Sequence, residues 1–321
     1  MPTINIRGHD VDVDIEAELK QYDWGYQAQW SSNKLIAPSP FRYDRTPSFF
    51  VNLDGEYAGT WGDSGYYDEE WASGNFVKLL AFMRQESYEE TEEYLIDTYG
   101  FINAVDRVTG EVRIKAPKIK QRRQYRPLDE SMVTPAVSRY LLKRGIPAEI
   151  QALYKTGYGK HRGFTAIPWR RADGTLANVK YRATRGKTFF YERGGWPIRQ
   201  SVWGIDVVTK ERTRTAVLCE AEIDAMTWSA AGDGELRGLA AGGVNFTEAQ
   251  ADIIRRSPIK RLILGGDNDK AGRKFNEQAA RMLKGHVELM AVNYGDKKDA
   301  NEAGVEALRR ADVKSCCLFR L

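Results

Sequence analysis

The chain has 321 residues, of which 42% are apolar and 29% are charged, and its formal net charge is +4. This balance is typical of a folded globular protein and argues against an intrinsically disordered one. No apolar run approaches the roughly 20 residues of a membrane-spanning helix, and the first residues lack the pattern of a secretory signal. Three cysteines, two of them adjacent, argue against a disulfide framework and a cysteine-rich zinc site. We therefore expect a cytoplasmic protein without a membrane partner.

Residues 1–104 are predicted to form an N-terminal unit of short strands, turns and two helices. Prolines and alternating apolar positions over 33–52 favour short strands and turns. Residues 55–74 are rich in Gly, Tyr and Trp, which favours a β-ribbon with loops. The apolar spacing predicts helices over 76–83 and 87–99.

A basic linker is predicted over 105–130, followed by a middle unit over 131–201. Seven Lys or Arg residues and no acid lie between Arg113 and Arg126. Clustered positive charge favours a polyanionic partner, and a solvated linker is the alternative. The middle unit is predicted to contain one helix, two strands and the turn between the strands, over 138–144, 163–168, 176–181 and 171–174, respectively.

The final unit, 202–321, alternates strands with helices, which predicts a mainly parallel four-stranded sheet flanked by helices. The predicted strands are 216–219, 236–240, 261–264 and 287–292, and the predicted helices are 223–231, 247–256, 271–283 and 301–310. The fold class expected for the whole chain is therefore a multidomain α/β and α+β protein.

Acidic side chains follow two of these strands. Glu220 comes directly after the apolar run 215–219, and Asp267 and Asp269 follow 261–264. The carboxyl ends of parallel strands meet at one edge of a sheet, where open α/β sheets bind ligands. Clustered carboxylates raise one another's pKa, and a hard divalent cation relieves the repulsion. A magnesium-dependent site for phosphate chemistry is therefore predicted here.

Three motifs in the final unit resemble those of the Toprim domain, which bacterial-type primases share with type IA topoisomerases. They are Val217-Leu-Cys-Glu-Ala-Glu-Ile-Asp224, Gly265-Gly-Asp-Asn-Asp-Lys-Ala-Gly272 and Lys298-Asp-Ala-Asn-Glu302. The third looks like the corresponding motif of phage primase-helicases. Asn301 stands where many primases have a second aspartate, which is expected to weaken one metal position.

Two upstream regions are also similar to primases. The stretch from Tyr140 to Asp206 resembles the basic subdomain that precedes Toprim, and 37–49 with 73–80 resembles the zinc-binding module. Where that module has Cys-Pro-Phe-His, this chain has Ser39-Pro-Phe-Arg42, and the expected second cysteine pair falls in the cysteine-free stretch 59–73. We therefore expect no zinc. Burial of aromatic residues is expected to stabilise the ribbon instead, namely Phe41, Phe49, Phe50, Trp61, Tyr66, Tyr67 and Trp71.

The resemblance implies roles for individual acids. Glu220, Asp267 and Asp269 are expected to be catalytic and to bind Mg2+ or Mn2+, with Asp224 and Asp299 completing the metal site. Asp224 could instead favour the start of a helix through the macrodipole, and Asp299 could lie beside the cap of the last helix. Glu222 has no family role and is interpreted as a surface acid.

The same resemblance implies a set of basic contacts to template phosphates or nucleoside triphosphates. A basic surface without a defined ligand is the alternative. The predicted residues are Lys180, Arg182, Arg185, Lys187 and Lys270. Trp169, Phe189 and Phe190 could stack on bases, although aromatic residues among strands more often belong to the core.

Together these features predict a DNA primase that makes RNA primers on single-stranded DNA from nucleoside triphosphates. No helicase motif follows the final unit, so a separate replicative helicase is expected, and the compact layout suggests phage replication in a host cytoplasm. Two alternatives remain open. The same metal cluster could serve a nuclease, or the chain could be a non-catalytic single-stranded-DNA-binding adaptor with a primase fold.

Overall fold

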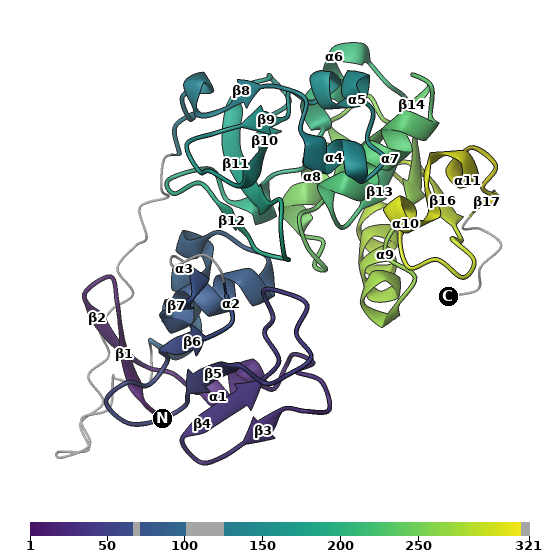
Figure 1. Ribbon diagram of the computed structural model, residues 1–321. Helices are drawn as coiled ribbons and strands as arrows, with labels where there is room; N and C mark the ends of the chain where they lie inside the picture. Colours follow the sequence, from purple (N-terminus) through teal and green to yellow (C-terminus); the bar gives the residue numbers. More distant parts are fainter. Residues whose placement is uncertain (67–70, 101–124, 316–321) are drawn as a thin grey trace. The chain divides into compact units, whose positions relative to one another are not determined.

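The computed structural model describes residues 1–66, 71–100 and 125–315. These residues fall into two compact units (Figure 1). Unit 1 comprises those within Met1–Gln124 together with Arg185–Phe189, and unit 2 comprises those within Tyr125–Thr184 together with Phe190–Leu321. Most of the predicted basic linker lies outside the described residues. The predicted boundaries at 104, 130 and 201 stay predictions.

Unit 1 contains a hairpin, an antiparallel sheet of order β3-β4-β5-β6-β7 and three helices. The helices predicted over 76–83 and 87–99 are confirmed as α2 and α3, and Ser87 closes a capping box at the start of α3. The elements are β1 (Thr3–Ile6), β2 (His9–Asp12), α1 (Ile15–Leu19), β3 (Gln29–Trp30), β4 (Lys34–Ala37), β5 (Phe49–Asn52), β6 (Trp61–Asp63), β7 (Ser73–Gly74), α2 (Phe76–Arg84) and α3 (Tyr88–Tyr99).

Aromatic side chains fill the core of unit 1. The Phe41 ring lies 4.8 Å from both the Trp61 ring and the Phe82 ring, measured between centroids. Of the seven aromatic residues predicted to be buried, Phe50 is only half-buried and Tyr67 lies outside the described residues. The other five are buried, namely Phe41, Phe49, Trp61, Tyr66 and Trp71. Aromatic burial on this scale can hold a small ribbon together.

Unit 2 begins with a sheet of order β12-β11-β10-β9-β8. Its centre is the antiparallel pair β10–β11, which a turn at 171–174 connects; Gly174 there has a φ of +85°. The elements are β8 (Thr134–Pro135), α4 (Arg139–Lys143), α5 (Ala148–Leu153), β9 (Gly157–Tyr158), β10 (Phe164–Arg170), β11 (Leu176–Ala183) and β12 (Phe189–Tyr191), with single 3-10 turns at Glu130–Met132 and Ile198–Gln200.

A second sheet, of order β14-β13-β15-β16-β17, forms the rest of unit 2. Its first four strands are parallel, as predicted, and β17 is an antiparallel edge strand that the sequence analysis did not predict. The elements are α6 (Ile205–Glu211), β13 (Thr215–Cys219), α7 (Glu222–Ala231), β14 (Leu236–Ala240), α8 (Glu248–Arg255), β15 (Arg261–Leu264), α9 (Lys270–Leu283), β16 (Glu288–Val292), α10 (Ala300–Ala303), α11 (Val305–Arg309) and β17 (Val313–Ser315).

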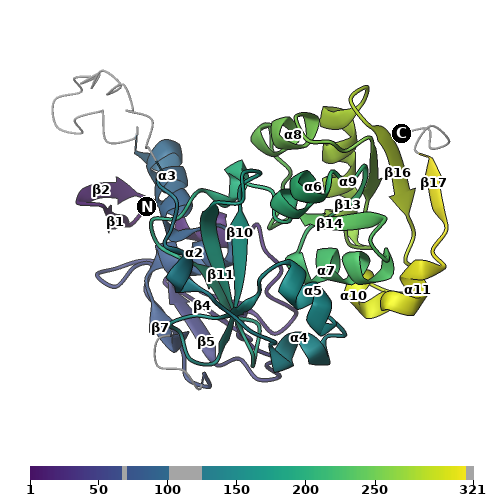
Figure 2. The ribbon, with the colours of Figure 1, turned by 90° about the horizontal axis from the view of Figure 1, so that it is seen from above.

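Helices cover both faces of this parallel sheet (Figure 2). Helices α6, α8 and α9 pack on one face, where Ile205, Ile254 and Phe275 share a core with strand residues such as Leu218 and Leu262. Helix α7 lies on the other face, with α10 and α11 beside it. The helix predicted over 301–310 is divided at Gly304, whose φ of +81° breaks the helical path. The layers leave the carboxyl ends of β13 and β15 as the place where loops can build a site.

Among the described residues, none of the helices combines the length and the apolar character needed to cross a membrane.

Candidate metal site at the strand ends

The first two acidic motifs meet because β13 and β15 are parallel neighbours in register. Leu218 pairs with Leu264, so Glu220 and the loop after β15 leave the sheet at the same edge. The backbone N–H of Asp267 donates a hydrogen bond to Glu220 Oε1 at 3.1 Å. Glu220 is only 8% exposed, so this contact is shielded from water. The predicted convergence of Glu220 with the loop that carries Asp267 is therefore present in the structure.

Two features shape the loop that carries Asp267 and Asp269. Asp269 caps α9, because its Oδ1 accepts the Gly272 N–H at 2.9 Å. At Gly272 itself, a Cβ would lie 1.9 Å from the Asp267 carbonyl oxygen, so no larger residue fits without moving the loop. This close approach folds the loop back on the first turn of α9. Asp269 therefore has a structural role in addition to any ionic one.

The third motif contacts the first through Asp224. Asp224 is buried in the first turn of α7, and its Oδ1 accepts the Asn301 N–H at 2.9 Å. Asp299 caps α10 by accepting the Glu302 N–H at 2.7 Å. Asp224 and Asp299 therefore do make contacts at the start of a helix, as the alternative interpretations held. These hydrogen bonds do not use all of the oxygen atoms of the two carboxylates.

Burial and mutual repulsion raise the pKa values of Glu220, Asp224 and Asp267. Burial raises the pKa of Glu220 to about 7, with a further contribution from Asp267. Burial also raises the pKa of Asp224 to about 8, and Asp299 adds to the effect. For Asp267, burial again raises the pKa, although Lys298 acts against it. Several carboxylates that resist ionisation together form a site in need of positive charge.

Lys298 supplies part of that charge, and the sequence analysis did not single it out. Its Nζ lies 3.2 Å from Asp267 Oδ2. Burial lowers the pKa of Lys298, but Asp267, Asp269 and Asp299 together outweigh this effect and the net pKa is raised. The lysine at the first position of the third motif was the available signal, and only the fold shows which carboxylate it reaches.

Asn301 also has a role that its sequence position did not predict. Its Nδ2 donates to the Arg144 carbonyl at 2.7 Å and to Thr227 Oγ1 at 3.0 Å, while its Oδ1 accepts from Arg144 Nε at 2.7 Å. These contacts join α10, α7 and the end of α4. An aspartate could not donate the two amide hydrogen bonds, so this position suits an amide better than a metal-binding acid.

The donor set fits a hard divalent cation in its chemistry. The oxygen-only ligands of Glu220, Asp267 and Asp269 are of the kind that Mg2+ and Mn2+ prefer, and their neighbours Asp224 and Asp299 add negative charge. Among the residues that the structure describes, however, no three His, Cys, Asp or Glu side chains are close enough to hold one ion. The Asp267 carboxylate instead forms an ion pair with Lys298.

The predicted basic contacts differ in exposure. Arg185, Lys187 and Lys270 are exposed, whereas Arg182 is half-buried with its guanidinium 5.9 Å from the Tyr140 ring centroid. Lys187 Nζ lies 4.5 Å from the Tyr43 ring centroid within unit 1.

Lys180 is buried, and its Nζ lies 2.8 Å from Glu222 Oε2. The interpretation of Glu222 as a surface acid is therefore wrong, because the residue is only 2% exposed and holds an internal ion pair. The same position leaves Lys180 without access to a ligand at the surface. Trp169 is fully buried and belongs to the core.

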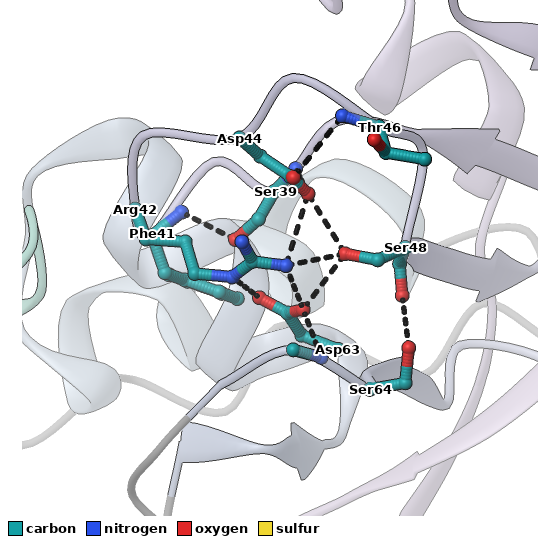
Figure 3. Close-up of polar contacts among 9 residues, drawn as sticks. Ser39, Phe41, Arg42, Asp44, Thr46, Ser48, Asp63 and Ser64 are labelled. Carbon is teal, nitrogen blue, oxygen red and sulfur yellow. Dashed lines mark hydrogen bonds and ion pairs between the residues drawn. The ribbon is translucent and has the colours of Figure 1, made fainter.

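The positions that correspond to zinc ligands in the primase module do not fit a zinc ion. The Arg42 guanidinium reaches between three acceptors, with Nη2 at 3.0 Å from Asp44 Oδ2, 3.1 Å from Asp63 Oδ1 and 2.5 Å from Ser48 Oγ (Figure 3). An arginine is a permanent cation without an acceptor, so it cannot ligate a metal and repels one nearby. The acids around Arg42 are neutralised by the protein itself.

One protein family matches the part of the chain that contains the parallel sheet. The Toprim-like family matches residues 217–304. No curated protein matches the chain. Similar solved structures include the Aquifex aeolicus primase with its zinc-binding and RNA polymerase domains, at 18% identity over 94% of this chain and 84% of that one, with a TM-score of 0.45.

Two further solved structures are similar over shorter stretches. The primase fragment of the bacteriophage T7 primase-helicase is 23% identical over 59% of this chain and 81% of that one, with a TM-score of 0.46. The E. coli primase catalytic core is 16% identical over 55% of this chain and 72% of that one, with a TM-score of 0.45. The family match, together with the four parallel strands and the acidic loops at their ends, identifies residues 217–304 as a Toprim-like domain.

Proposed function

We propose that this chain is a DNA primase, a nucleotidyltransferase that joins nucleoside triphosphates into short RNA primers on single-stranded DNA. The observation that carries the proposal is the hydrogen bond from the Asp267 N–H to Glu220 Oε1, which joins two Toprim motifs at one sheet edge. The raised pKa values of Glu220, Asp224 and Asp267 support it, because such a cluster favours bound cations.

Each acid has a distinct task in this proposal. Glu220, Asp267 and Asp269 would hold Mg2+ or Mn2+, while Asp224 and Asp299 keep the surroundings negative. The bound ions would stabilise the negative charge that develops on the attacking 3′-oxygen and on the leaving pyrophosphate. Lys298 contacts Asp267 and holds that carboxylate in place until an ion binds.

The predicted basic residues that are exposed or half-buried are the proposed contacts for phosphates. Lys270 lies in the first turn of α9, directly beside Asp269, where it could reach a triphosphate. Arg182, Arg185 and Lys187 are proposed to contact the template backbone, which would give affinity without sequence selectivity. Lys180 is left out of this set because of its buried ion pair.

The partners follow from the reaction. The proposal includes a single-stranded DNA template, nucleoside triphosphates and a separate replicative helicase, with a role in phage replication inside a host cytoplasm. The resemblance of residues 37–206 to primase segments upstream of Toprim favours a primase over other Toprim enzymes.

A primer-synthesis assay tests the proposal. Full-length protein is incubated with single-stranded templates, labelled ribonucleotides and either Mg2+ or Mn2+, beside Glu220→Gln and Asp267→Asn variants. The matched control is Asp296→Asn, because Asp296 is an exposed acid in the loop that leads to Lys298. We expect primers from the wild type and the control, and a loss of about a thousandfold or more in both site variants, since each removes part of a metal site worth several kcal/mol.

The other outcomes identify the alternatives. Metal-dependent shortening of the template, abolished by the same two variants, would replace the primase proposal with a nuclease. Template binding without any product, unchanged in Glu220→Gln, would indicate a non-catalytic adaptor. Either result would overturn the proposed function.

A further inference from the structure

In the sequence, Glu222 stands between Glu220 and Asp224 of the candidate metal site, but its side chain contacts the antiparallel sheet of unit 2. Its Oε2 lies 2.8 Å from Lys180 Nζ on β11, and its Oε1 accepts a hydrogen bond of 2.9 Å from Trp169 Nε1 on β10. The three residues, which we call the brace, are each at most 5% exposed. The brace joins the antiparallel sheet of unit 2 to the first residue of α7.

The start of α7 needs such a contact because it lacks the usual one. Its N-cap is Ala221, which has no side chain that could accept a backbone N–H. Helices α8 and α9 do have such a cap, from Thr247 and Asp269, whereas α5, α6 and α11 begin without one, as α7 does. A capping side chain fixes where a helix begins. At α7 the Glu222 ion pair is the contact that fixes it, and a carboxylate in the first turn also suits the helix dipole.

Trp169 is also linked to Glu220 through Gly242. A Cβ on Gly242 would lie 2.7 Å from the Trp169 ring, so the ring packs directly against this glycine, whose φ is +83°. The Gly242 N–H donates to the Glu220 carbonyl oxygen at 2.9 Å. Trp169 therefore supports the backbone of Glu220 from one side and the side chain of Glu222 from the other.

A buried ion pair is a poor source of stability. Removing two charges from water costs free energy that their attraction repays only in part, and apolar pairs of similar volume are often as stable or more so. The two directional contacts of Glu222, with Lys180 and Trp169, do, however, fix the position of the backbone at the start of α7. This favours a geometric purpose for the brace over a purely stabilising one.

We propose that Lys180, Trp169 and Glu222 are positioning residues that hold Glu220 and Asp224 in place for metal binding. The inference rests on the proposed function for the reaction but not for metal binding, which can be measured alone. The brace contacts no substrate. It sets the turn between β13 and α7, from which the Glu220 and Asp224 carboxylates project.

The test compares full-length wild type with the double variant Lys180→Met, Glu222→Leu, which removes both charges and leaves neither one buried alone. Mn2+ binding is measured by electron paramagnetic resonance, stability by thermal unfolding, and primer synthesis by its kcat and its KM for nucleotide. The control double variant is Arg170→Met, Glu130→Gln, which removes another ion pair of unit 2, of 2.6 Å, between the last residue of β10 and the 3-10 turn Glu130–Met132.

We expect the double variant to unfold within a few degrees of the wild type. Its affinity for Mn2+ is expected to fall about tenfold or more, as for other residues that orient metal ligands. The kcat should fall by a similar factor while the KM for nucleotide stays the same. The control should keep the Mn2+ affinity and the kcat of the wild type. Equal Mn2+ affinity and kcat in the wild type and the folded double variant would overturn the proposal.

Trp169→Phe gives a second route if the double variant does not fold. It keeps an aromatic side chain but removes both the donor to Glu222 and the far ring atoms, Cη2 and Cζ2, that pack against Gly242. We expect a several-fold loss of Mn2+ affinity, and no loss would overturn the proposal. A wild type that binds Mn2+ but makes no primers would refute the proposed function while leaving the brace testable by metal binding alone.

Discussion

Among the described residues, each unit contains a cluster of acids, and burial has opposite net results in the two clusters. In unit 1, Asp44 and Asp63 share the Arg42 guanidinium (Figure 3). Burial acts to raise the pKa of Asp44, yet hydrogen bonds from Ser48 and the backbone, together with Arg42, bring it below its ordinary value. In unit 2, the pKa values of Glu220 and Asp224 are raised instead.

The difference indicates which group awaits an external cation. The unit 1 acids have a permanent positive charge among them and gain nothing from a metal ion. Among the described residues, the unit 2 acids have Lys298, which contacts Asp267 and is largely exposed to solvent, and Arg144, which acts on Asp224 without reversing the rise of its pKa. Burial of several acids is therefore not enough to suggest a metal site. The missing counter-charge is the informative feature.

The largest expected effect comes from removing the internal cation of unit 1. Arg42→Met keeps much of the side-chain volume but leaves Asp63, which is 2% exposed, without its ionic partner. We expect a loss of about 3–5 kcal/mol in the free energy of unfolding, because an uncompensated buried charge remains. Urea denaturation measures it. Arg45→Met, at an exposed neighbouring arginine, is the control and should change stability by less than about 0.5 kcal/mol.

The acids of unit 2 predict a pH dependence for the metal-free protein. Because the pKa of Glu220 is raised from 4.5 to about 7, the folded state holds this proton more tightly than the unfolded chain does. The stability that results is fully present below about pH 4.5 and is lost as the pH rises to about 7. The loss is on the order of 3 kcal/mol. Denaturation of wild type and Glu220→Gln in chelator at several pH values measures the difference, and parallel pH profiles would contradict the prediction.

An additional acid near Asp224 should also lower the stability of the metal-free protein. Asn301→Asp replaces two amide N–H donors, now bonded to the Arg144 carbonyl and Thr227 Oγ1, with oxygen atoms that cannot donate. The added charge also lies near Asp224. We expect metal-free stability to fall by about 2 kcal/mol at neutral pH, because the buried Thr227 Oγ1 and the Arg144 carbonyl each lose a donor. Asn293→Asp is the comparison and should cost less, because Asn293 is exposed and its side-chain oxygen accepts the Gly295 N–H, a bond that an aspartate keeps.

The smallest expected effect is stabilisation by added metal. Mg2+ at ten times its dissociation constant should stabilise the wild type by about 1.4 kcal/mol, because it binds the folded state alone. Glu220→Gln should lose most of this response. Arg42→Met should keep it, since its acids belong to the other unit. Equal Mg2+ responses in wild type and Glu220→Gln would show that the ion binds elsewhere.

Local patterns predicted most of the Toprim-like domain. The strands predicted over 216–219, 236–240 and 261–264 match β13, β14 and β15 to within one residue, because buried parallel strands appear as short apolar runs before amphipathic helices. The edge strand β17 was missed. It is only three residues long and is partly exposed, so it carries neither an apolar run nor a clear alternation.

The sequence by itself determined the order of strands and helices and the three acidic motifs, because periodicity and motif spacing are local properties of a chain. Only the tertiary structure decided where the charges are paired. It placed Glu222 and Lys180 together inside unit 2 across 42 positions, and Arg42 beside Asp63 across 21. Whether a charge is buried, and which partner neutralises it, depends on contacts between elements that no local pattern records.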